Sequence, residues 1–180
     1  MSNKIAFFTK PYPWVRDHQK LIDEAAAHGL STVEGFNDGE FALPDVEAAK
    51  RLRAYADERG VHFCCLSCFA DLSGEQAAET VKRMKGYALI AEILGAPYLH
   101  HTVIPEYNAP AHVLPYREAL LRRGIDGVRE IFDFAAEHGV CAAYEDQGFI
   151  LNGVQGFGDF LERVDRPVGV VADFGNICQK

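Results

Sequence analysis

The chain has 180 residues, of which 48% are hydrophobic, and its formal net charge is −8. This acidic balance disfavours binding to nucleic-acid phosphates and to anionic membranes, because both need a basic face. No apolar run reaches the roughly 20 residues that span a bilayer. The first ten residues show no secretory signal pattern. We expect one cytoplasmic domain over residues 1–180, with enough apolar material for a sizeable core.

A short apolar strand is expected over residues 4–9, followed by a loop over residues 10–14. Two prolines in that loop block both helix and sheet. Trp14, also in the loop, either forms one wall of a substrate pocket or packs over the following helix. That helix is expected over residues 15–28 and ends at Gly29, which suits the left-handed cap position.

A repeated pattern then runs along the chain: a helix tail, a glycine and a short apolar strand. Strands alternating with helices indicate βα units and a parallel sheet. The pattern predicts strands that begin near residues 4, 31, 61, 97, 140 and 168. The intervening helices are expected over residues 44–59, 74–94 and 117–138.

The chain contains five cysteines, three of them close together at Cys64, Cys65 and Cys68. They lie in a continuous apolar run that is typical of a strand. Because adjacent strand residues face opposite sides, Cys64 and Cys65 are not expected to bind one ion. We interpret the three as core thiols of a protein from a reducing compartment.

Two parallel architectures compete, an open doubly wound sheet and a closed (β/α)8 barrel. A dinucleotide-binding sheet needs a glycine-rich turn after the first strand, and residues 10–14 contain no glycine. Ionisable or polar side chains end nearly every predicted strand, as expected where all strands meet at one end of a barrel. The sequence therefore favours a TIM-barrel type α/β fold. It is incomplete in this chain, with about six βα units where a barrel has eight.

Two of the predicted strands end in acids. Residues 140–144 are small or apolar and are followed by Glu145 and Asp146, and residues 167–172 are followed by Asp173. The carboxyl ends of parallel strands are where ligands and chemistry are found. Acids delivered there by two strands indicate a metal or proton-transfer site. The alternative is that these acids cap the next helix or face water.

Four segments together resemble the xylose isomerase-like TIM barrels: residues 33–36, 95–103, 139–148 and 168–176. That superfamily includes sugar and sugar-phosphate isomerases and epimerases, hydroxypyruvate isomerases, inosose dehydratases and endonuclease IV-type repair enzymes. The resemblance covers the whole chain in order, but its motifs are too short to select one member.

The resemblance implies roles for three residues. Glu145 matches a metal ligand that is also the catalytic acid or base, and Asp173 matches a second metal ligand. Asn176 takes the position of a substrate-binding histidine; it can form hydrogen bonds but cannot carry a proton. The two remaining ligands of the family, a histidine and a glutamate on the seventh and eighth strands, have no counterpart among the predicted elements.

Other strand ends supply further candidates. His100 and His101 are adjacent on a strand, so only one is expected to face the interior, as a substrate contact or, in an endonuclease-like member, a zinc ligand. Glu34 is either a site residue or the partner of a neighbouring base. The proline-rich segment over residues 104–115 is expected to be a loop that could close Tyr107 over substrate.

Three functions remain open. The first is an isomerase or epimerase that acts on a small sugar or keto-acid and uses a divalent metal, Mn²⁺, Mg²⁺ or Co²⁺. The second is a zinc-dependent phosphodiesterase, which the net charge of −8 opposes. The third is a non-catalytic barrel fragment that forms homo-oligomers through exposed sheet edges. Two carboxylates make a poor cage for an octahedral ion, so we expect this chain to bind metal weakly or not at all and to be inactive.

Overall fold

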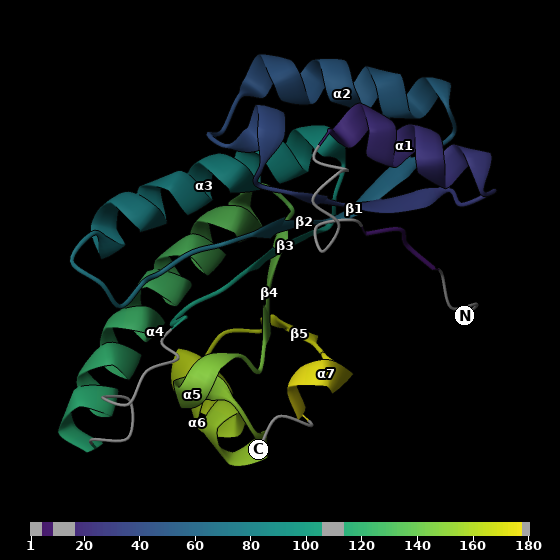
Figure 1. Cartoon of the computed structure of the whole chain (residues 1–180). Helices are drawn as coiled ribbons and strands as arrows, with labels where there is room; N and C mark the ends of the chain where they lie inside the picture. Colours follow the sequence, from purple (N-terminus) through teal and green to yellow (C-terminus); the bar gives the residue numbers. More distant parts are fainter. Residues whose placement is uncertain (1–4, 9–16, 106–113, 178–180) are drawn as a thin grey trace.

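The computed structural model describes residues 5–8, 17–105 and 114–177, and its centre is a parallel sheet (Figure 1). The spatial order of the strands is their order along the chain, and every neighbouring pair is parallel. This confirms the expected parallel α/β architecture. The strands are β1 (Thr32–Phe36), β2 (His62–Cys68), β3 (Tyr98–His101), β4 (Cys141–Glu145) and β5 (Gly169–Val171).

The connecting helices pack side by side, each against the next, and cover one face of the sheet (Figure 1). This is the arrangement expected when every strand is followed by a crossover helix. The longer helices are α1 (His18–Ala27), α2 (Val46–Glu58), α3 (Ala77–Leu94), α4 (Leu114–Glu137) and α6 (Val154–Val164). Three shorter elements are the 3-10 helix η1 (Gly39–Phe41), α5 (Gly148–Leu151) and α7 (Phe174–Ile177).

The first predicted strand is much reduced in the structure. Within the described part of residues 4–9, only Phe7 pairs with the sheet, as a single parallel bridge to Val33. Its N–H donates to the Thr32 carbonyl at 2.9 Å, and its carbonyl accepts from the Glu34 N–H at 3.0 Å. In the described part of the chain, the six expected strands are therefore five strands and one bridge, and Phe7 lies beside β1 where the first strand was predicted.

Helix ends follow local side-chain chemistry. Asp17 caps α1 by accepting the Gln19 N–H at 2.8 Å, and Asp45 caps α2 by accepting the Ala48 N–H at 2.9 Å. These caps place both helix starts two or three residues later than predicted. At the other end of α3, Gly95 has a φ of 70°, a left-handed conformation that glycine adopts without strain.

The core lies between the sheet and the helix layer. Alternate strand residues point into it, and the ring of Tyr144 from β4 packs edge-to-face on Phe160 from α6, with ring centroids 5.7 Å apart. Truncating a buried aromatic residue of this kind typically costs about 3–5 kcal/mol. Residues that form this layer include Val33, Leu66, Leu99, Ala142, Leu21, Met84, Tyr87, Val128 and Ile131.

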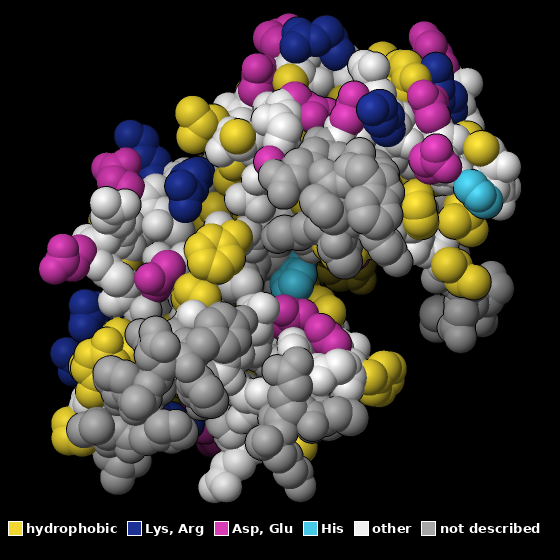
Figure 2. All heavy atoms as spheres, viewed as in Figure 1, with side chains coloured by type: hydrophobic (Ala, Val, Ile, Leu, Met, Phe, Trp, Pro, Cys, Tyr) yellow, Lys and Arg dark blue, Asp and Glu magenta, His cyan; other side chains and the backbone are white. Residues whose placement is uncertain are grey.

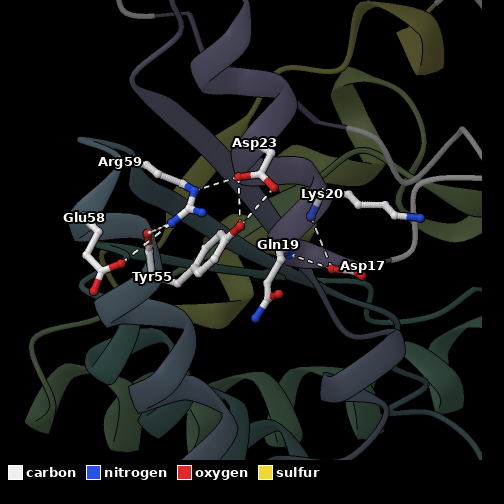
Figure 3. A network of polar contacts seen from close by, with 7 residues as sticks. All are labelled: Asp17, Gln19, Lys20, Asp23, Tyr55, Glu58 and Arg59. Atoms are coloured by element: carbon white, nitrogen blue, oxygen red, sulfur yellow. Dashed lines mark hydrogen bonds and ion pairs between the residues drawn. The ribbon is translucent and has the colours of Figure 1, made fainter.

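A polar network on the outer surface joins α1 to α2 (Figure 3). The Tyr55 hydroxyl donates to the Asp23 carboxylate at 2.9 Å, and the Arg59 guanidinium donates to the same carboxylate at 2.7 Å. Arg59 also stacks on the Tyr55 ring, 3.4 Å from its centroid. Because Asp23 and Arg59 are partly exposed to water, their ion pair adds little to stability.

The β5 edge of the sheet is apolar and exposed. Among the described residues, β5 pairs only with β4, so its outer edge has no strand neighbour. Val170 on this strand is 60% exposed, Phe174 on α7 is 79% exposed and Val154 on α6 is 92% exposed. Val170 and Val154 line an apolar groove of about 510 Å³ between β5 and α6. In the described part of the chain, no helix is long and apolar enough to cross a membrane.

Candidate active site

A cavity of about 560 Å³ lies at the carboxyl ends of the strands, on the face that the helices leave uncovered. Figure 2 shows a hollow on this side of the molecule in which a histidine side chain lies beside acidic side chains. The polar side chains that line the cavity come from every strand or from the segment just after it. They are Glu34, Ser67, His100, Thr102, Glu145, Gln147 and Asp173.

Strand alternation and register bring these groups together. Ser67 on β2 lies opposite His100 on β3, and Glu145 on β4 lies opposite Val171, two residues before Asp173. In each strand the neighbouring residues point into the helix layer instead, as Leu66, Leu99 and Tyr144 do. The parallel sheet therefore collects side chains that are far apart in sequence at one end of the molecule.

A chain of polar contacts crosses the cavity floor from β1 to β4. The Ser67 hydroxyl makes a short hydrogen bond with Oε1 of Glu34, and the same hydroxyl lies 3.1 Å from Nδ1 of His100. On the other side of the ring, Nε2 of His100 lies 3.7 Å from Oε2 of Glu145. The side chains of His100 and Glu145 are only 14% and 12% exposed, so little water screens this pair.

Asp173 has two functions in the structure. Its carboxylate lines the cavity, and its Oδ1 accepts the Gly175 N–H at 2.8 Å at the start of α7. The alternative of a helix cap therefore applies to Asp173, and its predicted role as a metal ligand stays a prediction. Asn176, one turn further on, donates its backbone N–H to the Asp173 carbonyl at 3.1 Å. Asn176 is not among the residues that line the cavity. Its contact with substrate stays a prediction.

The two adjacent histidines face opposite sides, as the strand geometry predicts. His101 is 1% exposed in the helix layer, where its Nδ1–H donates to the Thr102 carbonyl at 2.9 Å. Its Nε2 then accepts the Tyr144 hydroxyl at 3.0 Å. Burial lowers the pKa of His101 to about 4, so the ring is neutral at pH 7. Of the two predicted substrate contacts, His100 reaches the cavity and His101 does not.

Gln147 and Ser67 belong to the site although neither was among the predicted site residues. Gln147 follows Glu145 by two residues and lines the cavity, and its Oε1 is buried without a hydrogen-bond partner in the described chain. Ser67 occupies the end of β2 and links the glutamate to the histidine. A polar side chain at the end of an apolar strand was the sequence feature that could have identified Ser67 as a site residue. Trp14 and Tyr107, both predicted to contact substrate, lie outside the described residues.

The cysteine prediction needs correction. The register of β1 and β2 shifts between Val33 and Glu34, so that Cys64 is an extra, bulged residue. Cys64 and Cys65 are half-buried and line the same cavity of about 370 Å³, on the sheet face that also carries Glu34 and His100. Burial raises the pKa of the Cys65 thiol to about 12, which keeps it protonated. Of the three neighbouring cysteines, only Cys68 is a core residue.

The described residues supply only part of a divalent-metal site. Carboxylate oxygens such as those of Glu145 and Asp173 are the donors that Mg²⁺ and Mn²⁺ prefer. However, over residues 5–8, 17–105 and 114–177, no group of three His, Cys, Asp or Glu side chains could hold a metal ion. The type of donor suits the metal, and the number of donors does not make a complete site.

Solved structures share this fold. A D-psicose 3-epimerase from Clostridium cellulolyticum H10, solved with D-tagatose, superposes with a TM-score of 0.77 at 17% identity, over 93% of this chain and 62% of its own. A probable 3-DHS dehydratase from Bacillus anthracis gives 0.75 at 16% identity, over 97% and 64%. A xylose isomerase-like TIM barrel protein from Mycobacterium smegmatis, in complex with magnesium, gives 0.69 at 17% identity, over 89% and 57%.

These identities show the fold alone, and the chain spans less than two thirds of each of these three structures. A search of curated proteins gave no match. The family model of the xylose isomerase-like TIM barrel matches residues 22–180. That match begins in α1 and covers all five strands together with each cavity residue from Glu34 to Asp173. The chain belongs to the xylose isomerase-like TIM barrel family.

Proposed function

We propose that this protein is a sugar or keto-acid isomerase or epimerase, which moves a proton between adjacent carbons. One observation carries the proposal: Glu145, nearly buried at a strand end, faces His100 across 3.7 Å in a cavity that Asp173 also lines. A carboxylate with little exposure to water is a suitable general base. The cavity is large enough for a small hydroxy-carbonyl compound, and its lining combines polar side chains with apolar ones.

Glu145 has the role of acid and base in this proposal. Its carboxylate removes a proton from the carbon that carries the substrate hydroxyl group and returns it to the neighbouring carbon or to the opposite face. His100 lies beside one edge of that carboxylate, and Gln147 offers an amide oxygen to a substrate hydroxyl. Both groups belong to rigid elements or follow them directly, which keeps the base within reach of the proton.

A divalent metal, Mn²⁺, Mg²⁺ or Co²⁺, is part of the proposal for the whole protein. When bound, such an ion supplies positive charge where an enediolate oxygen develops. Glu145 and Asp173 would provide two of its ligands, and the rest would have to come from outside the described residues. We therefore propose that the 180-residue chain alone binds metal weakly and is inactive or incomplete.

The proposal is tested by proton exchange. A tagged copy of the chain, purified from its source cell with any polypeptide it binds, is incubated in D2O with Mn²⁺ and small hydroxy-carbonyl sugars. NMR then measures deuterium incorporation at the carbon next to the carbonyl. We expect exchange that Glu145→Gln abolishes and that Glu92→Gln, an exposed change on α3, leaves intact. Exchange that survives Glu145→Gln would contradict the assignment, and no exchange from a sample that contains a second, bound polypeptide would contradict the function.

A second proposal concerns assembly. We infer that copies of the chain associate through the β5 edge, because an exposed strand edge beside apolar side chains is prone to pair with another strand. Val170 and the groove between β5 and α6 form this surface. The proposal is independent of catalysis, and its test is the mass of the protein in solution.

A further inference from the structure

We propose that Ser67 and Glu34 are positioning residues that hold the His100 ring in one tautomer, with its proton on Nδ1 and with Nε2 presented to the cavity. The catalytic meaning of this arrangement rests on the proposed function, whereas its geometry does not. All three side chains lie on neighbouring strands, β1, β2 and β3, and line the cavity. The pairing of the three strands therefore fixes the distances between these three side chains.

The direction of the hydrogen bonds follows from the number of protons available. A serine hydroxyl has one proton to donate, and an ionised carboxylate can only accept. Ser67 therefore donates its hydroxyl proton to Oε1 of Glu34 in their short hydrogen bond. The Ser67 oxygen, 3.1 Å from Nδ1 of His100, is left as an acceptor, so the ring must donate from Nδ1.

This tautomer decides what Nε2 can do. In a neutral ring with the proton on Nδ1, Nε2 is a hydrogen-bond acceptor. His100 Nε2 and Glu145 Oε2, 3.7 Å apart, then form a pair of acceptors facing one side of the cavity. The ligand group that fits a pair of acceptors is a donor, such as a hydroxyl of the substrate. The arrangement therefore selects the hydroxyl side of a hydroxy-carbonyl compound at this point and orients it beside the base.

The neighbouring histidine supplies an internal comparison. His101 also has its proton on Nδ1, but there the acceptor is the backbone carbonyl of Thr102, which no side-chain substitution removes. His100 obtains the same tautomer from a side chain, so its tautomer depends on Ser67. A change at Ser67 should alter His100 and leave His101 as it is.

The test is long-range ¹H–¹⁵N NMR of the imidazole rings in uniformly ¹⁵N-labelled protein at pH 8, with His100 assigned from His100→Gln. We expect the wild type to show the proton on Nδ1 of His100. Ser67→Ala and Glu34→Ala should move it wholly or partly to Nε2. Ser73→Ala is the matched control, because Ser73 is a buried serine bonded to Asp71. The His101 signal, unchanged throughout, reports that each variant is folded.

Two outcomes overturn the proposal: a wild-type His100 with its proton on Nε2, or a tautomer that Ser67→Ala does not change. Activity is a separate measurement. If the proton-exchange assay works, Ser67→Ala should lower the rate roughly ten- to hundredfold, as loss of a supporting partner commonly does, and Ser67→Thr should restore it. If the NMR result holds and Glu145-dependent exchange is absent, the proposed function fails and the tautomer assignment stands.

Discussion

Tyr144 donates its hydroxyl to Nε2 of His101 across 3.0 Å, and the two rings meet edge to face with centroids 4.9 Å apart. This contact joins β4 to β3 on the helix side of the sheet, directly behind the cavity. Because Nδ1 of His101 already donates to the Thr102 carbonyl, both ring nitrogens are satisfied only in the neutral form. His101 is thus held by two hydrogen bonds on the helix side of the sheet, and His100, its neighbour on β3, faces the cavity on the other side.

The first prediction concerns acid stability. Burial holds the pKa of His101 at about 4, whereas the unfolded chain has the ordinary value of 6.5. Between these values the unfolded state binds a proton that the folded state does not, so stability falls as pH is lowered from 6.5 to 4. At about 1.4 kcal/mol per pKa unit, the loss across the window is about 3 kcal/mol.

Urea denaturation at several pH values between 7 and 4 measures this loss. His101→Gln should be less stable at pH 7, because it loses packing, but its stability should fall less steeply with acid. A variant with the same pH slope as the wild type would show that another group is responsible.

The second prediction compares two glycines with the same φ of 70°, Gly95 and Gly139. A Cβ at Gly139 would meet nothing within 4 Å, whereas at Gly95 it would lie 2.0 Å from Nη1 of Arg53. Gly139→Ala should therefore cost about 1–2 kcal/mol for the left-handed backbone alone. Gly95→Ala should cost about 1 kcal/mol more, because Arg53 must release the Leu94 carbonyl that it holds at 2.9 Å.

Chemical denaturation of both variants gives the difference. In an Arg53→Ala background the two alanine substitutions should cost the same. A persistent difference in that background would mean that the crowding at Gly95 does not come from Arg53.

The third prediction concerns Tyr87, which is fully buried in α3. Its hydroxyl donates to the Phe41 carbonyl at 2.7 Å and lies 3.0 Å from the Ala42 carbonyl, so it anchors η1 to the helix layer. Tyr87→Phe keeps the ring but leaves buried carbonyls without a donor, and should cost about 1–3 kcal/mol in thermal or urea unfolding. The exposed Tyr116→Phe is the control, and an equal effect from it would contradict the explanation.

The fourth prediction is the metal affinity of the isolated chain. With two carboxylates and no third donor of the required kind among the described residues, Mn²⁺ should bind more weakly than micromolar in isothermal titration. Asp173→Asn should change the titration little, because there is little affinity to lose. A micromolar dissociation constant that Asp173→Asn abolishes would show that the chain alone completes the site.

The fifth prediction concerns the β5 edge. Light scattering during size-exclusion chromatography should give a mass above the 19.9 kDa of one chain. Val170→Lys places a charge on the exposed edge and should shift the protein to the monomer. Val46→Lys, at an exposed position on α2, should leave the mass unchanged. A wild-type protein that is monomeric at every concentration would rule out this interface.

The parallel α/β fold was predictable because each strand is a short apolar run and the tails of α1, α2, α3 and α4 end at a glycine, such as Gly95 or Gly139. Each of these signals depends on a few consecutive residues, so it can be read without knowing the partners of the segment. The first strand was less predictable, because pairing depends on a partner. The apolar run over residues 4–9 predicts a strand, yet of its described residues only Phe7 pairs with β1.

The candidate site shows the same division. Alternation along β3 correctly separates His100 from His101, since it needs only the position of two neighbours on a strand. The same rule fails for Cys64 and Cys65, because a bulge between β1 and β2 inserts one residue and breaks the alternation. A bulge depends on the register of two strands about 30 residues apart. Ser67 was missed for a similar reason, since its partners come from β1 and β3.

The strand order has a consequence for how the protein forms during synthesis. Each strand pairs with the strand made just before it, so every new βα unit finds its template already present as the chain leaves the ribosome. No described strand has to wait for a distant segment, which limits the loop-closure entropy of each step. The growing edge is always the newest strand. Folding can thus keep pace with translation, and Glu34, Ser67, His100 and Glu145 join the site in that order.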